Sequence, residues 1–527
     1  MKKQLLTLFF GLFSLIAYSQ NVITDATINA GDTFTMTSGQ EYTLDGYVYV
    51  EAGATLIIEP GVVVRGIAFP SNGIDLTSAL IIARGATINA AGTAAEPIIF
   101  TSELDDVNVF DDLIAEDNNT WGGLIILGNS IVGEDGGTDV IEGLPNGGDD
   151  LRNIYGGDDV ADNSGILRYV SIRHGGSDIG ADNEINGLTL GGVGNGTEID
   201  FIEIFANQDD GIEFFGGSVN VTHAVVSFVG DDSYDMDESW SGYIQFALAL
   251  QGEGNGQGDS AIEYDGTEET DQDPNATGRI YNGTFIGAGA GAANSKSQGL
   301  VLKNNGNAQI FNSIFVDQVG PVYNFTDAAS AAIAGNIAFG FQNDLVVGPE
   351  PATFAVAQFN PFLGGISRIP NNGLDPRLRF GSLALNNAVA TTEGEVTAYR
   401  GAFDGSTNWA LGWTALDNAG YFGNFPDGFT STVDFGKADN GLTLHAPSPN
   451  PIRKTIANIS FELPDASDVQ IQVYDITGSV SSEFSLGRQP IGLNQYPLNV
   501  GNYANGTYIM VLRTEGAAVS QKLVISK

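Results

Sequence analysis

Residues 208–214 read Gln-Asp-Asp-Gly-Ile-Glu-Phe, and residues 230–236 read Gly-Asp-Asp-Ser-Tyr-Asp-Met, so one pattern returns after 22 residues. Each copy follows a run rich in β-branched and aromatic residues, at 199–205 and at 221–228, as β-strands prefer. Self-similarity at a period of about 20–50 residues is typical of solenoids. Because no amphipathic helical pattern separates the runs, the repeat predicts an all-β chain whose body is a right-handed parallel β-helix.

The repeat extends toward the N-terminus, where Gly-Ala-Thr-Leu at 53–56 returns as Gly-Ala-Thr-Ile at 85–88. A leucine-rich horseshoe would need a ladder of Leu and Asn, and a β-propeller its Trp-Asp signature; the sequence has neither pattern. We expect the body to span residues 20–441, with an N-terminal cap and long loops. The residues expected to stack inward from coil to coil are Ile202, Ile204, Val225 and Phe228.

The composition excludes several classes of function. The 527 residues include 64 Asp and Glu against 21 Lys and Arg, which gives a net charge of −43. Binding to nucleic acid or to an anionic membrane needs clustered cations, so we expect neither partner. The chain has no Cys and therefore no disulfide, thiolate nucleophile or Cys-ligated metal.

The first residues have the layout of a secretory signal peptide. Two lysines precede an apolar run from Leu5 to Ile16, and small residues at Ala17 and Ser19 suit cleavage before Gln20. We therefore expect residues 1–19 to be removed on export. No later segment has 18 consecutive apolar residues, so no transmembrane segment is expected in the mature protein.

A change in charge marks a second domain at 442–527. This block has six basic and six acidic residues, whereas the chain before it carries the whole negative charge. Its start, residues 445–451, is Pro-rich and resists both helix and sheet. Short strand patterns with Asn-Gly and Thr-Gly turns follow, so a small Ig-like β-sandwich is expected.

This C-terminal block resembles the type A sorting domain of the bacterial type IX secretion system. The resemblance rests on Pro-Asn-Pro at 449–451, Val-Tyr-Asp-Ile-Thr-Gly at 473–478, Asn-Gly-Thr-Tyr at 505–508 and the closing Lys-Leu-Val-Ile-Ser-Lys at 522–527. It implies that the type IX machinery is a partner and that the protein crosses the outer membrane. The resemblance also implies release from the cell or attachment to surface lipopolysaccharide, usually after removal of this domain.

The body resembles a poorly characterised family of type IX cargo proteins with a pectin-lyase-like solenoid. The matching stretches include Glu-Pro-Gly-Val at 59–62, Trp-Gly-Gly-Leu-Ile at 121–125, residues 209–217 and Tyr-Arg-Gly-Ala-Phe at 399–403. The resemblance implies the β-helix fold for nearly the whole mature chain. It implies no activity, because the family has none that is settled.

Paired carboxylates are the main candidates for a site. If the two Asp-Asp turns stack on adjacent coils, charges about 4.8 Å apart repel by roughly 3 kcal/mol at an effective dielectric near 20. A cation, solvent exposure or a retained proton would offset this repulsion, and calcium suits oxygen ligands of irregular geometry. The predicted calcium ligands are Asp209, Asp210, Asp231, Asp232 and Asp235, with Asp271, Asp273 and Asn275 in a loop of alternating oxygen-bearing residues.

Catalysis by the same carboxylates is the alternative. The stretch 230–232 weakly resembles the Asp pair of polygalacturonase-type hydrolases, and Asp209, Asp210, Asp231 and Asp232 would then act as general acid and base on a glycosidic bond. Those enzymes carry a His and a basic clamp downstream, but here the only His after Asp232 is His445, in the sorting block. The sequence therefore favours a protein that is not an enzyme.

Two aromatic residues beside the acidic repeat, Tyr234 and Trp240, are predicted to face a ligand, since such rings stack on sugars. Together these features predict a secreted or outer-membrane-surface β-helix protein that binds a glycan or extracellular matrix. The ligand would be a polysaccharide or surface lipopolysaccharide, with calcium as a cofactor. The alternative is a polysaccharide hydrolase.

Overall fold

The computed structural model describes residues 21–134, 136–142, 144, 150–180, 183–266, 277–304, 306–326, 331–379, 381–423, 442–445, 447–448, 450–453, 455–475, 480–514 and 517–527. β-Strands dominate these ranges, and the α-helix α1 (Ala415–Asn418) is four residues long. No helix within them has both the length and the apolar character needed to cross a membrane.

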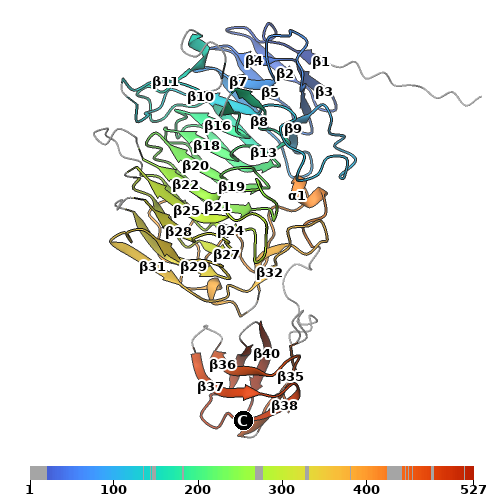
Figure 1. Ribbon diagram of the computed structural model, residues 1–527, viewed down its shortest axis with the longest axis vertical. Helices are drawn as coiled ribbons and strands as arrows, with labels where there is room; N and C mark the ends of the chain where they lie inside the picture. Colours follow the sequence, from blue (N-terminus) through green and yellow to red (C-terminus); the bar gives the residue numbers. More distant parts are fainter. Residues whose placement is uncertain are drawn as a thin grey trace, which may run out of the picture.

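The body is a parallel β-helix in which successive coils add strands to a ten-stranded sheet (Figure 1). Neighbouring strands pair in parallel and in register, for example Ile212 with Leu188 on one side and with Tyr234 on the other. The strands of this sheet are β4 (Tyr47–Val50), β7 (Ala79–Ile82), β10 (Leu124–Leu127), β16 (Leu188–Gly191), β18 (Ile212–Phe215), β20 (Tyr234–Asp237), β22 (Ser260–Asp265), β25 (Gln298–Lys303), β28 (Tyr323–Phe325) and β30 (Val346–Val347).

A second sheet of seventeen strands completes the coils. The long strand β13 pairs with β8 through its first half and with β9 through its second. The two halves of one long strand therefore lie on two sides of the solenoid. These strands are β1 (Asn21–Ile23), β2 (Thr33–Met36), β3 (Glu41–Leu44), β5 (Thr55–Ile58), β6 (Val63–Gly66), β8 (Thr87–Ala91), β9 (Ile98–Ser102), β13 (Gly165–Arg173), β17 (Glu198–Phe205), β19 (Asn220–Ser227), β21 (Tyr243–Leu250), β23 (Arg279–Tyr281), β24 (Thr284–Ile286), β26 (Gln309–Phe311), β27 (Ile314–Val316), β29 (Ala332–Phe339) and β31 (Thr353–Ala357).

Each long strand bends at one residue with positive φ. The bends are at Tyr169, Phe201, His223 and Phe246, with φ of 48°, 55°, 51° and 61°. Since this left-handed conformation turns the chain sharply, it separates the two halves of each strand. The rings at the bends stack from coil to coil, with centroids 4.4 Å apart for Tyr169 and Phe201 and 4.3 Å apart for Phe201 and His223.

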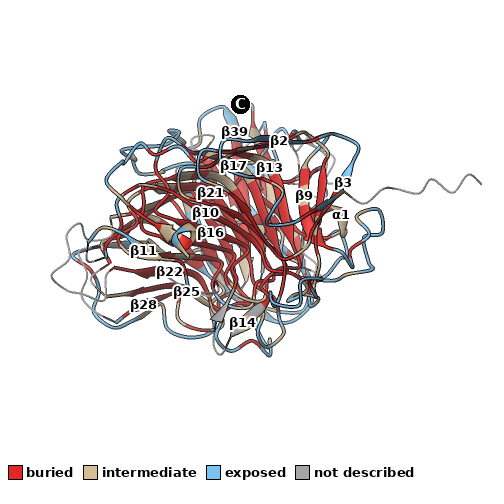
Figure 2. Ribbon diagram, turned by 90° about the horizontal axis from the view of Figure 1, so that it is seen from above, coloured by how far each residue is buried: buried red, intermediate tan, exposed pale blue. Residues whose placement is uncertain are grey.

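The core lies inside the coils, and Figure 2 shows that buried residues concentrate on the strands. Ile202 and Ile204 belong to this core, as predicted. Val225 and Phe228 are buried as well, but in a second cluster that also contains residues of the C-terminal part of the body. The prediction that both face inward was wrong. The bend at His223 changes which side chains of β19 point out of the solenoid, and Phe228 lies just after β19 with a positive φ of 58°.

The C-terminal part of the body packs against the outside of the β-helix. Trp413 lies edge-on against Tyr169, with ring centroids 5.5 Å apart, and Tyr421 packs against Phe228 at 5.0 Å. The remaining small strands of the body are β11 (Asp139–Val140), β12 (Ile154–Tyr155), β14 (Asp178–Gly180), β15 (Asn183–Glu184), β32 (Leu363–Gly365) and β33 (Asp375–Leu378).

The C-terminal domain is antiparallel throughout its strand pairs and has its own core, which includes Ile459, Phe461, Ile471 and Leu512. This arrangement confirms the predicted fold class, a parallel β-helix followed by a small β-sandwich. One sheet contains β34 (Thr443–Leu444), β35 (Ile456–Leu463) and β38 (Gly492–Asn499), and the other β36 (Ser467–Asp475), β37 (Val480–Gln489), β39 (Gly506–Thr514) and β40 (Ala517–Ile525).

Candidate functional site

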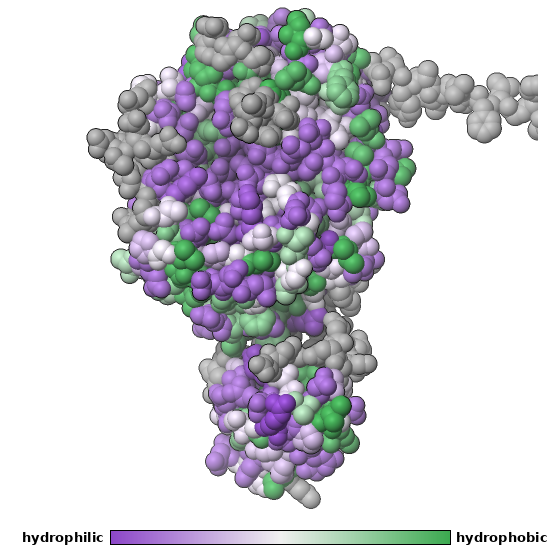
Figure 3. Space-filling model, viewed as in Figure 1, coloured by the Kyte–Doolittle hydropathy of each residue, from purple (hydrophilic) through white to green (hydrophobic). Residues whose placement is uncertain are grey.

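Carboxylates stack on the outer face of the ten-stranded sheet. Glu213 on β18 pairs with Asp235 on β20, and Asp235 pairs with Glu263 on β22. Side chains alternate along a strand, so the flanking residues Tyr234 and Met236 point into the core, where both are fully buried. In the view of Figure 3, hydrophilic residues cover most of the middle of the body.

The turns that precede these strands carry the paired Asp residues of the repeat. Asp210 and Asp232 occupy equivalent positions on adjacent coils, and the backbone N–H of Asp232 donates to Asp210 Oδ1 at 2.8 Å. Asp232 Oδ1 in turn accepts from the backbone N–H of Ser260. The two carboxylates thus link successive coils, and Asn186 occupies the equivalent position one coil earlier.

Two groups of three carboxylates share Asp210. Ligand atoms of Asp209, Asp210 and Asp231 lie within 4.8 Å of one another, and so do those of Asp210, Glu213 and Asp235. Asp232 belongs to neither group. Four of the five calcium ligands predicted from the two turns are therefore brought together, and Glu213 joins them.

Burial and mutual repulsion raise the pKa values of these carboxyls. Burial is the main cause for Asp210, Glu213, Asp232 and Asp235, whose pKa values lie well above the usual range. The second cause is the charge of neighbouring carboxylates, chiefly Asp235 for both Asp210 and Glu213. A cation or bound protons would offset this repulsion.

The prediction that Tyr234 and Trp240 face a ligand was wrong. Both side chains are fully buried. Tyr234 Oη lies within hydrogen-bonding distance of the carbonyls of Leu248 (3.0 Å) and Ala224 (3.2 Å), which share its single proton, and Trp240 Nε1 donates to the carbonyl of Val219 at 3.2 Å. Both rings stabilise the inside of the solenoid. The calcium ligands predicted at Asp271, Asp273 and Asn275, like the signal peptide, lie outside the described residues.

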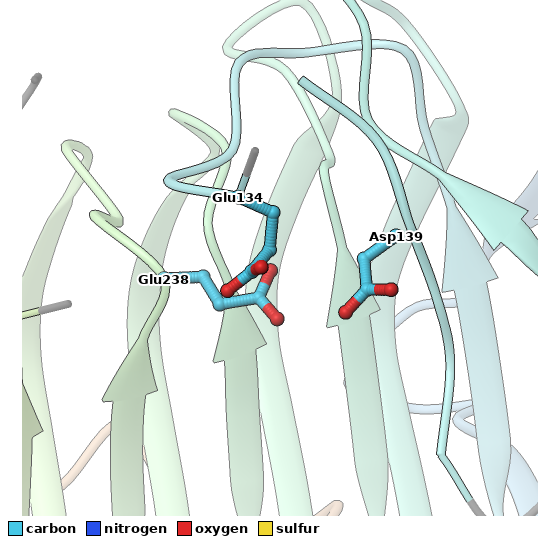
Figure 4. A group of neighbouring side chains, drawn as sticks. All are labelled: Glu134, Asp139 and Glu238. Atoms are coloured by element: carbon cyan, nitrogen blue, oxygen red, sulfur yellow. The ribbon is translucent and has the colours of Figure 1, made fainter. Parts of the chain in front are cut away.

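A third carboxylate group was not expected from the sequence. Glu134, Asp139 and Glu238 point toward one another from three segments (Figure 4). Tyr155 Oη donates to Glu238 Oε1 at 2.6 Å, and burial raises the pKa of Glu238 to about 8. These residues come from loops and from strand β11, so no local pattern could have revealed the group.

A polar groove of about 570 Å³ opens beside the paired Asp turns. Gln208 and Gly230 line it, and each directly precedes the first Asp of a turn. The other walls come from distant parts of the sequence. The lining residues are Ala115, Glu116, Asn118, Gln208, Phe228, Gly230, Gly252, Glu253, Gly254, Asn255, Gly256, Gln257, Arg368, Ile369 and Tyr421.

Comparison with solved structures finds the full-length tailspike protein 2 of Escherichia coli O157:H7 bacteriophage CAB120. The sequence identity is 10% and the TM-score 0.30. The match covers 94% of this chain and 64% of the tailspike, so the chain spans less than two thirds of that protein. A search of curated proteins found no match.

Comparison with protein families gives two matches. Residues 448–526 match the secretion system C-terminal sorting domain, so the protein is a type IX cargo that is secreted or attached to the cell surface. Residues 27–345, more than half of the chain, match the pectate-lyase like beta helix domain. The chain therefore belongs to the pectate-lyase-like β-helix domain family and carries a secretion-system sorting domain at its C-terminal end.

Proposed function

We propose that this secreted β-helix protein binds a neutral glycan in the groove beside the paired Asp turns. The groove is the observation that carries the proposal, since its volume of about 570 Å³ falls within the range of about 300–1,000 Å³ typical of ligand sites. Its lining combines amide side chains, such as that of Gln208, with the aromatic side chains of Phe228 and Tyr421. Sugar rings offer both hydroxyl groups and apolar faces, and this lining complements both.

The charges around the groove favour a neutral sugar over an acidic one. Glu116 and Glu253 line it, and Arg368 is the one cation among the described residues of its lining. Arg368 already donates to Asp317 Oδ2 at 3.2 Å and to the carbonyl of Gly287 at 2.6 Å. An anionic sugar would meet net negative charge without a cation free to pair with it.

Calcium is part of the proposal. The group of Asp209, Asp210 and Asp231 adjoins the groove through Gln208 and Gly230, and its oxygens lie close enough together to share one cation. A Ca²⁺ ion takes six to eight oxygen ligands, so sugar hydroxyls that reach it would complete its coordination. Glycan affinity would then depend on calcium.

Hydrolysis by the Asp turns is the second candidate. Burial raises the pKa of Asp232, and a raised pKa favours the protonated form that a general acid needs. The geometry of the Asp turns favours hydrolysis less than binding. Asp232 is only 5% exposed, and one of its oxygens accepts a backbone hydrogen bond. Binding without turnover therefore fits the geometry better.

A glycan array probed with the exported chain in millimolar Ca²⁺ tests the proposal, followed by titration of the best neutral oligosaccharide. Gln208→Ala should weaken binding about 2- to 10-fold, the effect of one lost hydrogen bond. The matched control is Gln40→Ala, an exposed Gln on the N-terminal coils, which should bind as the wild type does.

Three results would contradict the proposal. The first is an array without any bound glycan, and the second is equal loss of affinity in both Gln variants. The third is release of reducing sugar by the wild type that disappears when Asp231→Asn and Asp232→Asn are combined, which would establish the hydrolase instead.

A further inference from the structure

The carboxylates of Asp210, Glu213 and Asp235 form a compact group at the outer face of β18 and β20, with two members buried and Asp235 partly buried. Their nearest oxygens lie within 4.8 Å of one another. Asp210 and Glu213 are each only 7% exposed. Water therefore screens their mutual repulsion poorly, and three negative charges at this spacing need compensation.

Protein cations supply little of this compensation, since Lys303 attracts Asp235 without forming an ion pair with it. Among the described residues, no Lys or Arg forms an ion pair with Asp210, Glu213 or Asp235. Lys303, on the same sheet, contacts Glu263 and lies 3.4 Å from Asp265. The charge of Lys303 is thus shared between Asp235 and the two carboxylates that it contacts.

A neighbouring amide points to a ligand. Asn186 is 4% exposed, and its Nδ2 donates to Glu213 Oε2, so the amide reaches into the group. Among the described residues, Asn186 Oδ1 is buried and has no hydrogen-bond donor, and the same holds for Asp235 Oδ1. Buried oxygens without a partner are rare in folded proteins, and here one belongs to the neighbouring amide and one to a carboxylate of the group itself.

We propose that Asp210, Glu213, Asp235 and Asn186 bind one Ca²⁺ ion. All the ligands are oxygens, which hard cations prefer. Two oxygens on opposite sides of Ca²⁺ lie up to about 5 Å apart, since each Ca–O distance is about 2.3–2.6 Å, so oxygens within 4.8 Å fit around one ion. Mg²⁺ is smaller and demands tighter octahedral geometry, so it fits this spacing less well.

The site has a structural role that goes beyond glycan binding. Asn186 precedes β16, Asp210 and Glu213 belong to the β18 coil, and Asp235 lies on β20. One ion would therefore connect three consecutive coils at a point where carboxylates repel. Calcium would stabilise the body whether or not a glycan occupies the groove.

Calorimetric titration of Ca²⁺ into the chelator-treated full chain tests the site. Glu213→Gln and Asp235→Asn keep the side-chain shape but remove a charged ligand, and each should weaken calcium binding at least tenfold. Asp231→Asn is the matched control, because it removes a carboxylate from the neighbouring group only, and it should keep the calcium event that the other two variants lose. Circular dichroism establishes that each variant is folded.

Several results would overturn the proposal. The first is that the wild type binds no calcium at millimolar concentration, and the second is that both site variants bind calcium with wild-type affinity. The third is that Asp231→Asn loses all calcium binding, and the fourth is that the wild type binds Mg²⁺ as tightly as Ca²⁺. The glycan proposal is tested separately from the calcium site. Gln208→Ala should weaken glycan binding and leave calcium binding at this site unchanged.

Discussion

Substitution of Glu203 should lower the stability of the body more than most single changes, because its buried carboxylate binds the C-terminal segment to the β-helix. Glu203 lies on β17 and is fully buried. It accepts the backbone N–H groups of Ala415 at 2.6 Å and Leu416 at 3.0 Å, the first two residues of α1. It also accepts the Ser171 hydroxyl at 2.6 Å, and the buried Arg173 interacts with its charge.

Glu203→Ala would remove the acceptor from three donors and leave Arg173 as a less compensated buried cation. Breaking such an arrangement from one side costs about 3–5 kcal/mol. Glu203→Gln retains one acceptor oxygen and should cost less, about 1–3 kcal/mol. Because Tyr421 follows α1 and lines the groove, both variants should also lower glycan affinity.

Urea unfolding measures the loss, and limited proteolysis locates it, with new cleavage expected within residues 403–421. The order wild type, Glu203→Gln, Glu203→Ala in falling stability is the predicted result. An unfolding midpoint of Glu203→Ala equal to that of the wild type would refute the reasoning, and so would cleavage that begins elsewhere in the body.

Three further outcomes are expected. In chelator-treated protein, the melting temperature should fall as pH rises from 4.5 to about 8. Burial raises the pKa of Glu238 to about 8, so in this interval the folded chain holds more protons than the unfolded chain. A melting temperature that rises across the interval would contradict the raised pKa of Glu238. Asn282→Ala should cost about 2 kcal/mol in chemical unfolding, since the buried amide donates to the Tyr399 carbonyl at 2.8 Å; unchanged stability would count against this role. Deletion of residues 448–526 should leave the body folded but retained inside the cell, as fractionation and circular dichroism would show; a truncated body in the medium would exclude the sorting role.

The architecture was predictable because it depends on a repeat. The 22-residue spacing of the Asp-Asp turns places Ile212 and Tyr234 in register, and the same spacing stacks Asp210 on Asp232. The sorting domain was predictable for a different reason, since its matching stretches follow one another in order over a short block.

The site was predictable only in part. Glu213 was missed although it alternates with buried Ile212 and Phe214, a pattern that places it on the outer face with Asp235. The same alternation places Tyr234 in the core, so applying it to the whole repeat would have corrected that prediction. The groove could not be predicted, because residues as distant as Glu116 and Tyr421 meet there only in the folded chain.

A crystal structure of the exported protein with Ca²⁺ and the best neutral oligosaccharide from the array would test the central claim most directly. We predict density for sugar rings in the groove, within hydrogen-bonding distance of Gln208 and in contact with Tyr421. Sugar bound at another surface of the body, with the groove occupied by water alone, would contradict the proposed function.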